Sequence, residues 1–390
     1  MLAHQDAGNG TSAATVLLDE LRDTPEVVWG FALALGIVLL LTPAIGQMAR
    51  RIGAVDAPEP RRLNELPVPR LGGLALFLGI LVPALAFLEI NREARGLLLG
   101  AAIATTVGAI DDFRGLLWWQ KLAGQVTAAA VPTAFGIYID RFTFPLLTDP
   151  YLELPTWLGV GATIVWVVAL MNMVNFLDGM DGLAAGVCGI AGFTFAVIAL
   201  SLGKPTAAVF SAIVAGACFG FLRHNFFPAR IFMGDSGALL LGYALATIAI
   251  QGLLKTASTV VLFFPLVMLA IPILDTTFVL ARRIKHGEKL YAADQAHLHF
   301  RFLRRGFSQR RAALTMYAWC VTLAGAAFAT RFVPFREGGE WHLWPTLLAA
   351  AIGLVAVAFS IYVVYILELV KLASRRGRRR EEAEAERKTA

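Results

Sequence analysis

The chain has 390 residues, of which 57% are hydrophobic and 16% are charged, and its mean hydropathy is +0.67. A soluble domain has about 45–50% apolar and about 25% charged residues. This composition therefore excludes an ordinary soluble protein and indicates one that is solvated by lipid. The net charge of +6 does not indicate a nucleic-acid partner, because the excess positive charge lies mainly at the ends of apolar segments and in the tail.

Three cysteines, Cys188, Cys218 and Cys320, lie inside apolar runs. They form no CxxC pair and no Cys/His pattern with metal-ligand spacing. Disulfides and structural zinc are therefore not expected.

Eleven apolar windows follow one another along the chain, each near the length of about 20 residues that crosses roughly 30 Å of hydrocarbon. They lie near 26–48, 72–90, 97–112, 121–138, 156–174, 183–202, 205–222, 236–252, 258–281, 312–331 and 345–370. Backbone groups in lipid must be hydrogen-bonded within the segment, so the windows are predicted to be helices rather than strands. The predicted fold class is all-α, a polytopic membrane protein with about eleven transmembrane helices.

Lysine and arginine gather in the loop 50–70, in the loop 282–311 and in the tail after residue 374. Eleven crossings put all three on one side, and the positive-inside rule makes that side the cytoplasm, with the N-terminus outside. The expected organisation is a polar N-terminal extension over 1–24 without signal-peptide features, one membrane domain over 25–373 and a charged cytoplasmic tail over 374–390.

Polar side chains that are costly in lipid gather at the cytoplasmic ends of these predicted helices. They are Asp111, Asp112, Asn172, Asn175, Asp178, Asp181, Asn225, Asp235, Asp294, His297 and His299. Any one of them could be a hydrated loop residue. The whole set on one membrane face predicts a functional site.

Asp111 and Asp112 end a predicted helix, where the helix dipole disfavours two adjacent anions. Arg114, Lys121 or a divalent cation that bridges to a phosphate could compensate them. The alternative is a hydrated turn capped by Arg114.

Four polar side chains follow at every third position: Asn172, Asn175, Asp178 and Asp181. Each step of three falls about 60° short of a full helical turn, so a continuous helix would spread them around its axis. We expect the helix to end here, aided by Gly179 and Gly182, so that the last three side chains enter one cavity. Their oxygens suit Mg²⁺. The EF-hand spacing is absent.

The run Phe232-Met-Gly-Asp-Ser-Gly237 opens another predicted span. Asp235 or Ser236 could be its N-cap. A helix N-terminus also binds anions, and an aspartate beside a bound pyrophosphate requires a metal between them. The second interpretation makes Asp235 a metal ligand.

In the loop that starts at Asp294, His297 and His299 stand two residues apart. In an extended backbone their rings point the same way. Arg301, Arg304 and Arg305 follow, and arginine forks bind phosphate bidentately. The positive-inside rule alone would explain the arginines as cytoplasmic loop residues, but it would not explain the histidines.

These four motifs, in this order, resemble the polyprenyl-phosphate N-acetylhexosamine-1-phosphate transferase family over roughly residues 40–320. The resemblance implies Mg²⁺-dependent transfer, with Mn²⁺ as an alternative, of a sugar 1-phosphate from a UDP-sugar to undecaprenyl or dolichyl phosphate with release of UMP. The sequence Arg304-Arg305-Gly306-Phe307 resembles the bacterial UDP-N-acetylglucosamine branch, which starts O-antigen and teichoic-acid linkage synthesis. The implied location is the inner (plasma) membrane with a cytoplasmic active site, and a homodimer is a further expectation.

The resemblance also implies roles for individual residues. The catalytic set is Asp111, Asp112, Lys121, His297 and His299; the substrate-binding set is Asn172, Asp178, Asp181, Asn225, Phe232, Arg301 and Arg304; the metal ligands are Asp235 and Asn175. Phe232 matches an aromatic that stacks on uracil. The sequence departs from the family pattern at Arg62, Asn64 and Phe300, where lysine, histidine and histidine are usual.

The implied mechanism is phosphoryl transfer, with Asp111 or Asp112 deprotonating the attacking lipid phosphate. We favour Asp111, which lies one residue deeper towards the bilayer. Three alternatives stay open. They are UDP-muramoyl-pentapeptide as the donor, whose translocase typically has three consecutive histidines; a secondary transporter, whose charged sites usually lie near the midplane; and a CDP-alcohol phosphotransferase, whose D-G-x-x-A-R signature is missing.

Overall fold

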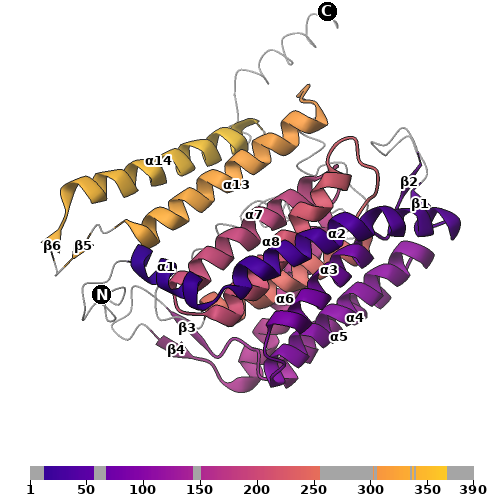
Figure 1. The fold of residues 1–390 in the computed structure, drawn as a ribbon, viewed down its shortest axis with the longest axis horizontal. Coiled ribbons are helices and arrows are strands. Elements are labelled where there is room, and N and C mark those ends of the chain that lie inside the picture. The colour runs from indigo at the N-terminus through magenta and orange to yellow at the C-terminus, as the bar shows by residue number, and fades with distance from the viewer. Residues whose placement is uncertain are drawn as a thin grey trace, which may run out of the picture.

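The computed structural model describes residues 13–56, 67–143, 151–254, 302, 305–333, 336–337 and 340–366. They form a helical bundle (Figure 1). Its helices are α1 (Ala13–Asp23), α2 (Glu26–Arg51), α3 (Gly72–Phe87), α4 (Arg92–Arg114), α5 (Trp118–Ala134), α6 (Thr156–Leu177), α7 (Leu183–Ser201), α8 (Pro205–Asn225), α9 (Gly234–Ile248), the π-helix η2 (Ala249–Leu254), α13 (Gln309–Phe332) and α14 (Leu343–Ile366).

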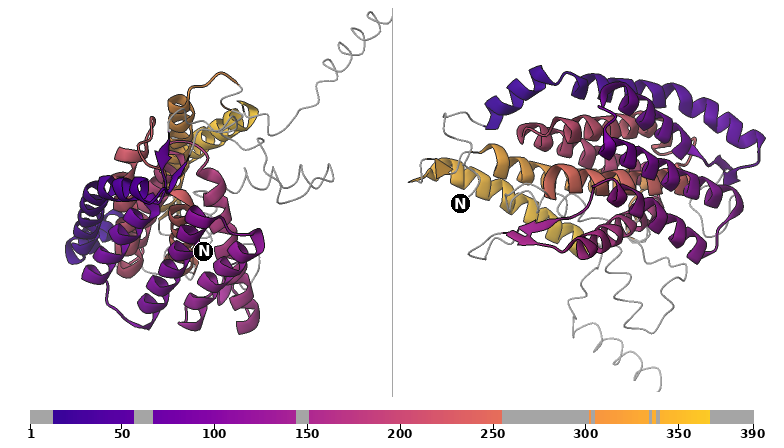
Figure 2. Two further views of the ribbon diagram at one scale, coloured as in Figure 1. Left: turned by 90° about the vertical axis from the view of Figure 1, so that its right-hand side faces the viewer. Right: turned by 90° about the horizontal axis from the view of Figure 1, so that it is seen from below.

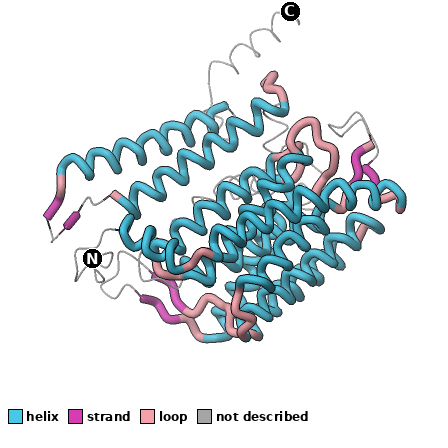
Figure 3. Tube along the Cα trace, in the orientation of Figure 1, coloured by secondary structure: helices cyan, strands magenta, loops and turns pink. Residues whose placement is uncertain are grey.

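Three antiparallel two-stranded hairpins, which the all-α prediction did not include, join helices in the described chain (Figure 3). They are β1 (Val55–Asp56) with β2 (Val68–Pro69), β3 (Arg141–Thr143) with β4 (Tyr151–Glu153), and β5 (Arg336–Glu337) with β6 (Glu340–Trp341). In Figure 1 the β1–β2 hairpin lies at one end of the bundle and the other two lie at the opposite end. Each is a short connection outside the long helices.

Ten of the eleven predicted apolar windows overlap described helices, and the window 258–281 lies outside the described residues. Seven described helices are long and apolar enough to cross a membrane: α2, α4, α6, α7, α8, α13 and α14. The protein is a polytopic, helical membrane protein. The count of eleven spans and the orientation stay predictions.

Two helix starts differ from the prediction. Helix α4 begins at Arg92 rather than near 97, because the Asn91 side chain accepts a hydrogen bond from the Ala94 N–H at 2.8 Å and caps the helix. Helix α1 lies within the segment that was expected to be only a polar extension. Its Leu17 and Leu21 pack against a cluster of Ala199, Leu200, Ala207 and Ala208 between α7 and α8.

Helix α9 lies at the centre of the bundle, in contact with α3, α4, α6, α7 and α8. All its side chains from Ser236 to Ile248 are buried. The hydroxyl of Tyr243 donates to the Leu97 carbonyl of α4 at 3.0 Å, and a Cβ added at Gly242 would lie 2.6 Å from the Met171 Cα of α6. This packing fixes the N-terminus of α9 in the middle of one end of the bundle.

The remaining helices surround this centre. Helix α2 packs along α8, and α8 packs along α7. Helices α13 and α14 pair with each other at one side of the bundle, as the end-on view and the view from below both show (Figure 2). The ends of α2, α4, α6 and α8 and the starts of α3, α5, α7 and α9 consequently meet at the end that carries the β1–β2 hairpin (Figure 1).

Candidate active site

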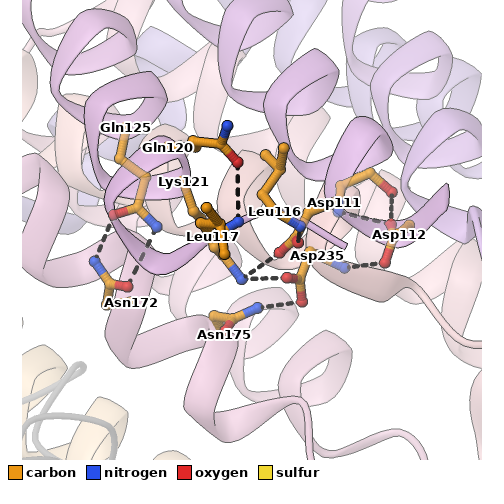
Figure 4. Close-up of polar contacts among 11 residues, drawn as sticks. Asp111, Asp112, Leu116, Leu117, Gln120, Lys121, Gln125, Asn172, Asn175 and Asp235 are labelled. Carbon is orange, nitrogen blue, oxygen red and sulfur yellow. Dashed lines mark hydrogen bonds and ion pairs between the residues drawn. The ribbon is translucent and has the colours of Figure 1, made fainter. Parts of the chain in front are cut away.

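Lys121, in the first turn of α5, lies between two aspartates that come from different helices (Figure 4). Its Nζ lies 2.9 Å from Asp111 Oδ2, at the end of α4, and also forms an ion pair with Asp235 Oδ2, at the start of α9. Asn175, near the end of α6, donates from Nδ2 to Asp235 Oδ1 at 2.7 Å. Four helix ends thus bring two carboxylates, one ammonium group and one amide together.

The α4–α5 turn fixes Asp111. Its Oδ1 accepts a hydrogen bond from the Leu116 N–H at 2.6 Å. Gly115, at φ 67°, ends α4 in a backbone conformation that favours glycine. The Asp111 side chain is 13% exposed and that of Lys121 is 20% exposed. The pair is therefore held in place and still open to a ligand.

Asp112 has a different set of partners. Its carboxylate accepts hydrogen bonds from the Asp235 N–H at 2.8 Å, the Ser236 N–H at 3.0 Å and the Ser236 hydroxyl at 2.8 Å. The N-cap residue of α9 is Met233, which makes no side-chain cap. The alternative interpretation, in which Asp235 or Ser236 is the N-cap of this helix, is therefore excluded. A carboxylate from α4 satisfies the free N–H groups and the positive helix end instead.

Glycines allow the close approach of α3, α4 and α9 at this point. A Cβ at Gly234 (φ 68°) would lie 2.4 Å from Asp112 Oδ2, one at Gly108 would lie 2.4 Å from Ser236 Cα, and one at Gly73 would lie 2.1 Å from the Gly237 nitrogen. Most of these neighbouring atoms are backbone. The start of α9 is therefore locked against α3 and α4, and Asp235 with it.

Helix α6 ends at Leu177, as expected, and Gly182 precedes α7 at φ 76°. Gly179 does not adopt a positive φ, so only Gly182 has the role that was expected of both glycines. Asn225, which is 2% exposed, accepts from the Gly182 N–H at 3.1 Å and donates to the Ile231 carbonyl at 2.9 Å. The chain reversal thus depends on a buried amide from α8.

Two further contacts hold the segment 178–182 in place. Asp181 Oδ2 accepts from the Ala229 N–H at 2.9 Å, and the Tyr317 hydroxyl of α13 donates to the Gly182 carbonyl at 2.6 Å. Asp181 and Asn225 therefore join the segments 178–182 and 226–233 to each other. Both were predicted to bind substrate, and this structural role accounts for their hydrogen bonds without one.

Asn172 does not reach the Asp111–Lys121–Asp235 cluster. It donates to Gln125 Oε1 at 2.8 Å and accepts from Gln125 Nε2 at 3.2 Å, which joins α5 to α6 (Figure 4). Phe232 is partly buried, and its N–H donates to the Pro69 carbonyl at 2.9 Å. The predicted residues His297, His299, Arg301 and Arg304 lie outside the described residues, as do Asp294, Phe300, Arg62 and Asn64.

Sequence reasoning missed the roles of Gln125, Arg70 and Ser236. Gln125 carries an amide in the middle of an apolar window, where a polar side chain is costly. That position alone could have identified it as a residue with a polar partner. Arg70 was counted only as a topological charge. Its positive charge favours the ionised form of Asp178, in the segment between α6 and α7.

The segment 178–182 carries two carboxyl groups with perturbed ionisation. Burial raises the pKa of Asp178 well above its ordinary value, and the negative charges of Asp235 and Asp112 raise it further, while Arg70 acts in the opposite direction. Burial also raises the pKa of Asp181, against the hydrogen bond from Ala229. The site therefore concentrates negative charge that a cation would stabilise.

The donor set fits Mg²⁺ rather than a metal held by protein ligands alone. Among the described residues, no group of three or more His, Cys, Asp and Glu side chains forms a ready metal site. Mg²⁺ usually takes one or two carboxylates and completes its shell with water and substrate phosphates. Asp235 Oδ1 accepts from Asn175 Nδ2, and Lys121 pairs with Asp235 Oδ2 and Asp111 Oδ2. Mg²⁺ would therefore take a carboxylate oxygen in exchange for one of these contacts and complete its shell with water and phosphate oxygens.

The fold and this site define an integral-membrane enzyme whose polar site lies at one end of its helices. Residues 94–253 match the profile of the family described as Glycosyl transferase family 4. That range contains Asp111, Lys121, Asn175 and Asp235.

Named relatives extend the match over most of the chain. A probable undecaprenyl-phosphate N-acetylglucosaminyl 1-phosphate transferase of Bacillus subtilis is 35% identical over 357 residues, which cover 89% of this chain and 98% of the relative. A decaprenyl-phosphate N-acetylglucosaminephosphotransferase of Mycobacterium tuberculosis is 33% identical, over 76% of this chain and 81% of the relative. A phospho-N-acetylmuramoyl-pentapeptide-transferase of Heliobacterium modesticaldum is 31% identical, over 70% and 89%.

The chain therefore belongs to glycosyl transferase family 4, as a polyprenyl-phosphate N-acetylhexosamine-1-phosphate transferase. This confirms the resemblance on which the predicted site roles depend.

Proposed function

We propose that the protein transfers N-acetylglucosamine 1-phosphate from UDP-N-acetylglucosamine to undecaprenyl phosphate, with release of UMP. The observation that carries the proposal is the cluster of Asp111, Lys121, Asp235 and Asn175 at the ends of four helices. The identity to relatives named for N-acetylglucosamine, 35% and 33%, exceeds the 31% to the muramoyl-pentapeptide transferase. The cluster supports the phosphoryl-transfer reaction, and the identities favour N-acetylglucosamine as the sugar of the donor.

In this reaction an oxygen of the lipid phosphate attacks the β-phosphorus of the donor, and the bond from that phosphorus to the UMP oxygen breaks. Asp111 is the proposed base, because its carboxylate is held by one backbone N–H and one ammonium group and borders the site. Lys121 is placed to attract the phosphates of both substrates. Asp112 instead holds the start of α9, which positions Asp235.

Asp235 and Asn175 would hold Mg²⁺, and Asp178 would add a nearby negative charge. The metal would neutralise charge on the donor diphosphate and on the departing UMP. Lys121 already supplies one positive charge to Asp111 and Asp235. The protein groups alone therefore position the two carboxylates before any substrate enters.

Asp178→Asn is expected to raise the melting temperature of the metal-free protein at pH 7–8. The unfolded chain ionises this group near the ordinary value of 3.8, whereas its pKa in the folded protein is raised. Ionisation above pH 3.8 therefore favours unfolding, and the stabilisation by asparagine should disappear as the pH falls towards 4.

Melting curves in EDTA between pH 4 and 8 measure this effect, and Mg²⁺ titrations of activity are the companion measurement. The variant should need more Mg²⁺ for half-maximal turnover, because one neighbouring negative charge is gone. If Asp178→Asn melts at a lower temperature than wild type at pH 8, groups other than a metal stabilise the charge on Asp178.

We propose that the protein lies in the plasma membrane with its site at the cytoplasmic face. Arg50, Arg51 and Arg70 lie at the same end of the bundle as Asp111 and Lys121, which is the arrangement that the positive-inside rule places in the cytoplasm. That face supplies the water-soluble donor while the prenyl chain stays in the bilayer. We also expect the protein to form a homodimer.

The donor is tested with purified protein, undecaprenyl phosphate, Mg²⁺ and a panel of UDP-sugars, with UMP release as the readout. UDP-N-acetylglucosamine is expected to give the highest kcat/KM among UDP-N-acetylglucosamine, UDP-N-acetylgalactosamine and UDP-muramoyl-pentapeptide. Preference for the pentapeptide donor would overturn the proposed specificity. Solute uptake into vesicles without UMP release would indicate a transporter instead.

A further inference from the structure

Backbone contacts from two other parts of the chain hold Arg70 at the end of the β1–β2 hairpin. Its N–H donates to the Ala54 carbonyl at 3.0 Å, and the carbonyl of the preceding Pro69 accepts from the Phe232 N–H at 2.9 Å. Leu71, the next residue, has φ 77°, a conformation that non-glycine residues rarely adopt. The position of residue 70 is therefore fixed between the end of α2 and the start of α9.

The side chain of Arg70 is not committed to a strong ion pair in the described part of the chain. Its Nη1 lies 3.4 Å from Asp56 Oδ1, and its side chain is 34% exposed whereas that of Asp56 is 9% exposed. A guanidinium group has five N–H donors in a planar fork. One contact at this distance orients the fork and leaves it able to bind a ligand bidentately.

Arg70 supplies a second cation near the start of α9. Lys121 lies between Asp111 and Asp235. The residues on both sides of Arg70 are hydrogen-bonded to the segment that leads into α9, since the Pro69 carbonyl accepts from the Phe232 N–H and the Gly72 N–H donates to the Phe232 carbonyl at 3.0 Å. The charge of Arg70 also acts on Asp178. A substrate with two phosphates at the start of α9 can therefore meet both cations.

We propose that Arg70 binds the diphosphate of the nucleotide-sugar donor and is a substrate-binding residue of this site. The inference rests on the proposed function, because it names the residue that holds the donor's diphosphate in that reaction. Arginine forks match phosphate oxygens in geometry and charge. The donor is favoured over the lipid phosphate because the residues on both sides of Arg70 are hydrogen-bonded to the segment that leads to α9 and Asp235, and Asp235 is the proposed ligand of the metal on the donor diphosphate.

The test compares the binding of UDP and uridine to the full-length protein in detergent with Mg²⁺, for wild type, Arg70→Gln, Arg70→Lys and Arg51→Gln. Arg70→Gln is expected to weaken UDP binding about 10- to 100-fold and to leave uridine binding unchanged. Arg70→Lys should recover part of the loss, because lysine keeps the charge but not the fork. Arg51, exposed at the end of α2, is the matched control and should behave as wild type.

The outcomes separate this proposal from the one on which it rests. Wild-type UDP affinity in Arg70→Gln, or equal loss of UDP and uridine binding, would overturn the role of Arg70 alone. A rise in KM for undecaprenyl phosphate with an unchanged KM for the donor would assign Arg70 to the acceptor and also overturn it. A wild-type protein that binds neither UDP nor uridine would refute the proposed function itself.

Discussion

Asp111→Asn is expected to lower turnover by about 10²–10⁴-fold, the contribution typical of general-base catalysis, while donor affinity and melting temperature stay near wild type. The reason is geometric. Asparagine can still accept the hydrogen bond that the Leu116 N–H gives at 2.6 Å, so the α4–α5 turn should survive. It cannot accept a proton from the lipid phosphate. Single-turnover UMP release across pH, alongside donor binding, measures the effect.

Asp112→Asn is the matched control for the neighbouring position. Asp112 accepts two backbone N–H groups and one hydroxyl group at the start of α9. Asparagine keeps only one acceptor oxygen, so at least one of these donors loses its partner, which should cost about 1–3 kcal/mol of stability, with a smaller effect on turnover per folded molecule. If Asp112→Asn loses turnover as fully as Asp111→Asn but keeps its melting temperature, the division of roles between the two aspartates is wrong.

Gly108→Ala is expected to reduce the yield of folded protein and its activity together. The added Cβ would lie 2.4 Å from both the nitrogen and the Cα of Ser236. These are backbone atoms, so no side chain can rotate away, and α4 and α9 must separate. Overpacking typically costs about 1–3 kcal/mol and occasionally more. Because Asp112 and Asp235 meet at this contact, a small separation should also disturb the site.

Gly36→Ala in α2 is the control for this change. A Cβ at Gly36 has no neighbour within 4 Å, and alanine favours helix over glycine by about 1 kcal/mol. Its melting temperature should be equal to or above that of wild type. Melting curves and UMP release for both variants test the pair. Wild-type stability and activity in Gly108→Ala would show that the α4–α9 contact is looser than described.

The sequence by itself determined the class, the positions of most helices and the set of polar residues at one end of them. Spans of about 20 apolar residues must be helical in lipid because the bilayer offers no other hydrogen-bond partner. Polar residues are costly at such helix ends, so Asp111, Asp112, Asn175 and Asp235 stood out from their surroundings. The resemblance to the family rested on these same residues.

Only the tertiary structure decided which of these residues contact one another in the site and which stabilise the packing of the helices. Asp112 and Asp235 are 123 residues apart in the chain, and periodicity within one helix contains no information about a partner on another. The structure therefore separated Asp111, beside Lys121, from Asp112, which caps α9. It also paired Asn172 with Gln125 rather than with the site, because side-chain contacts between helices depend on how the helices pack, which no local pattern encodes.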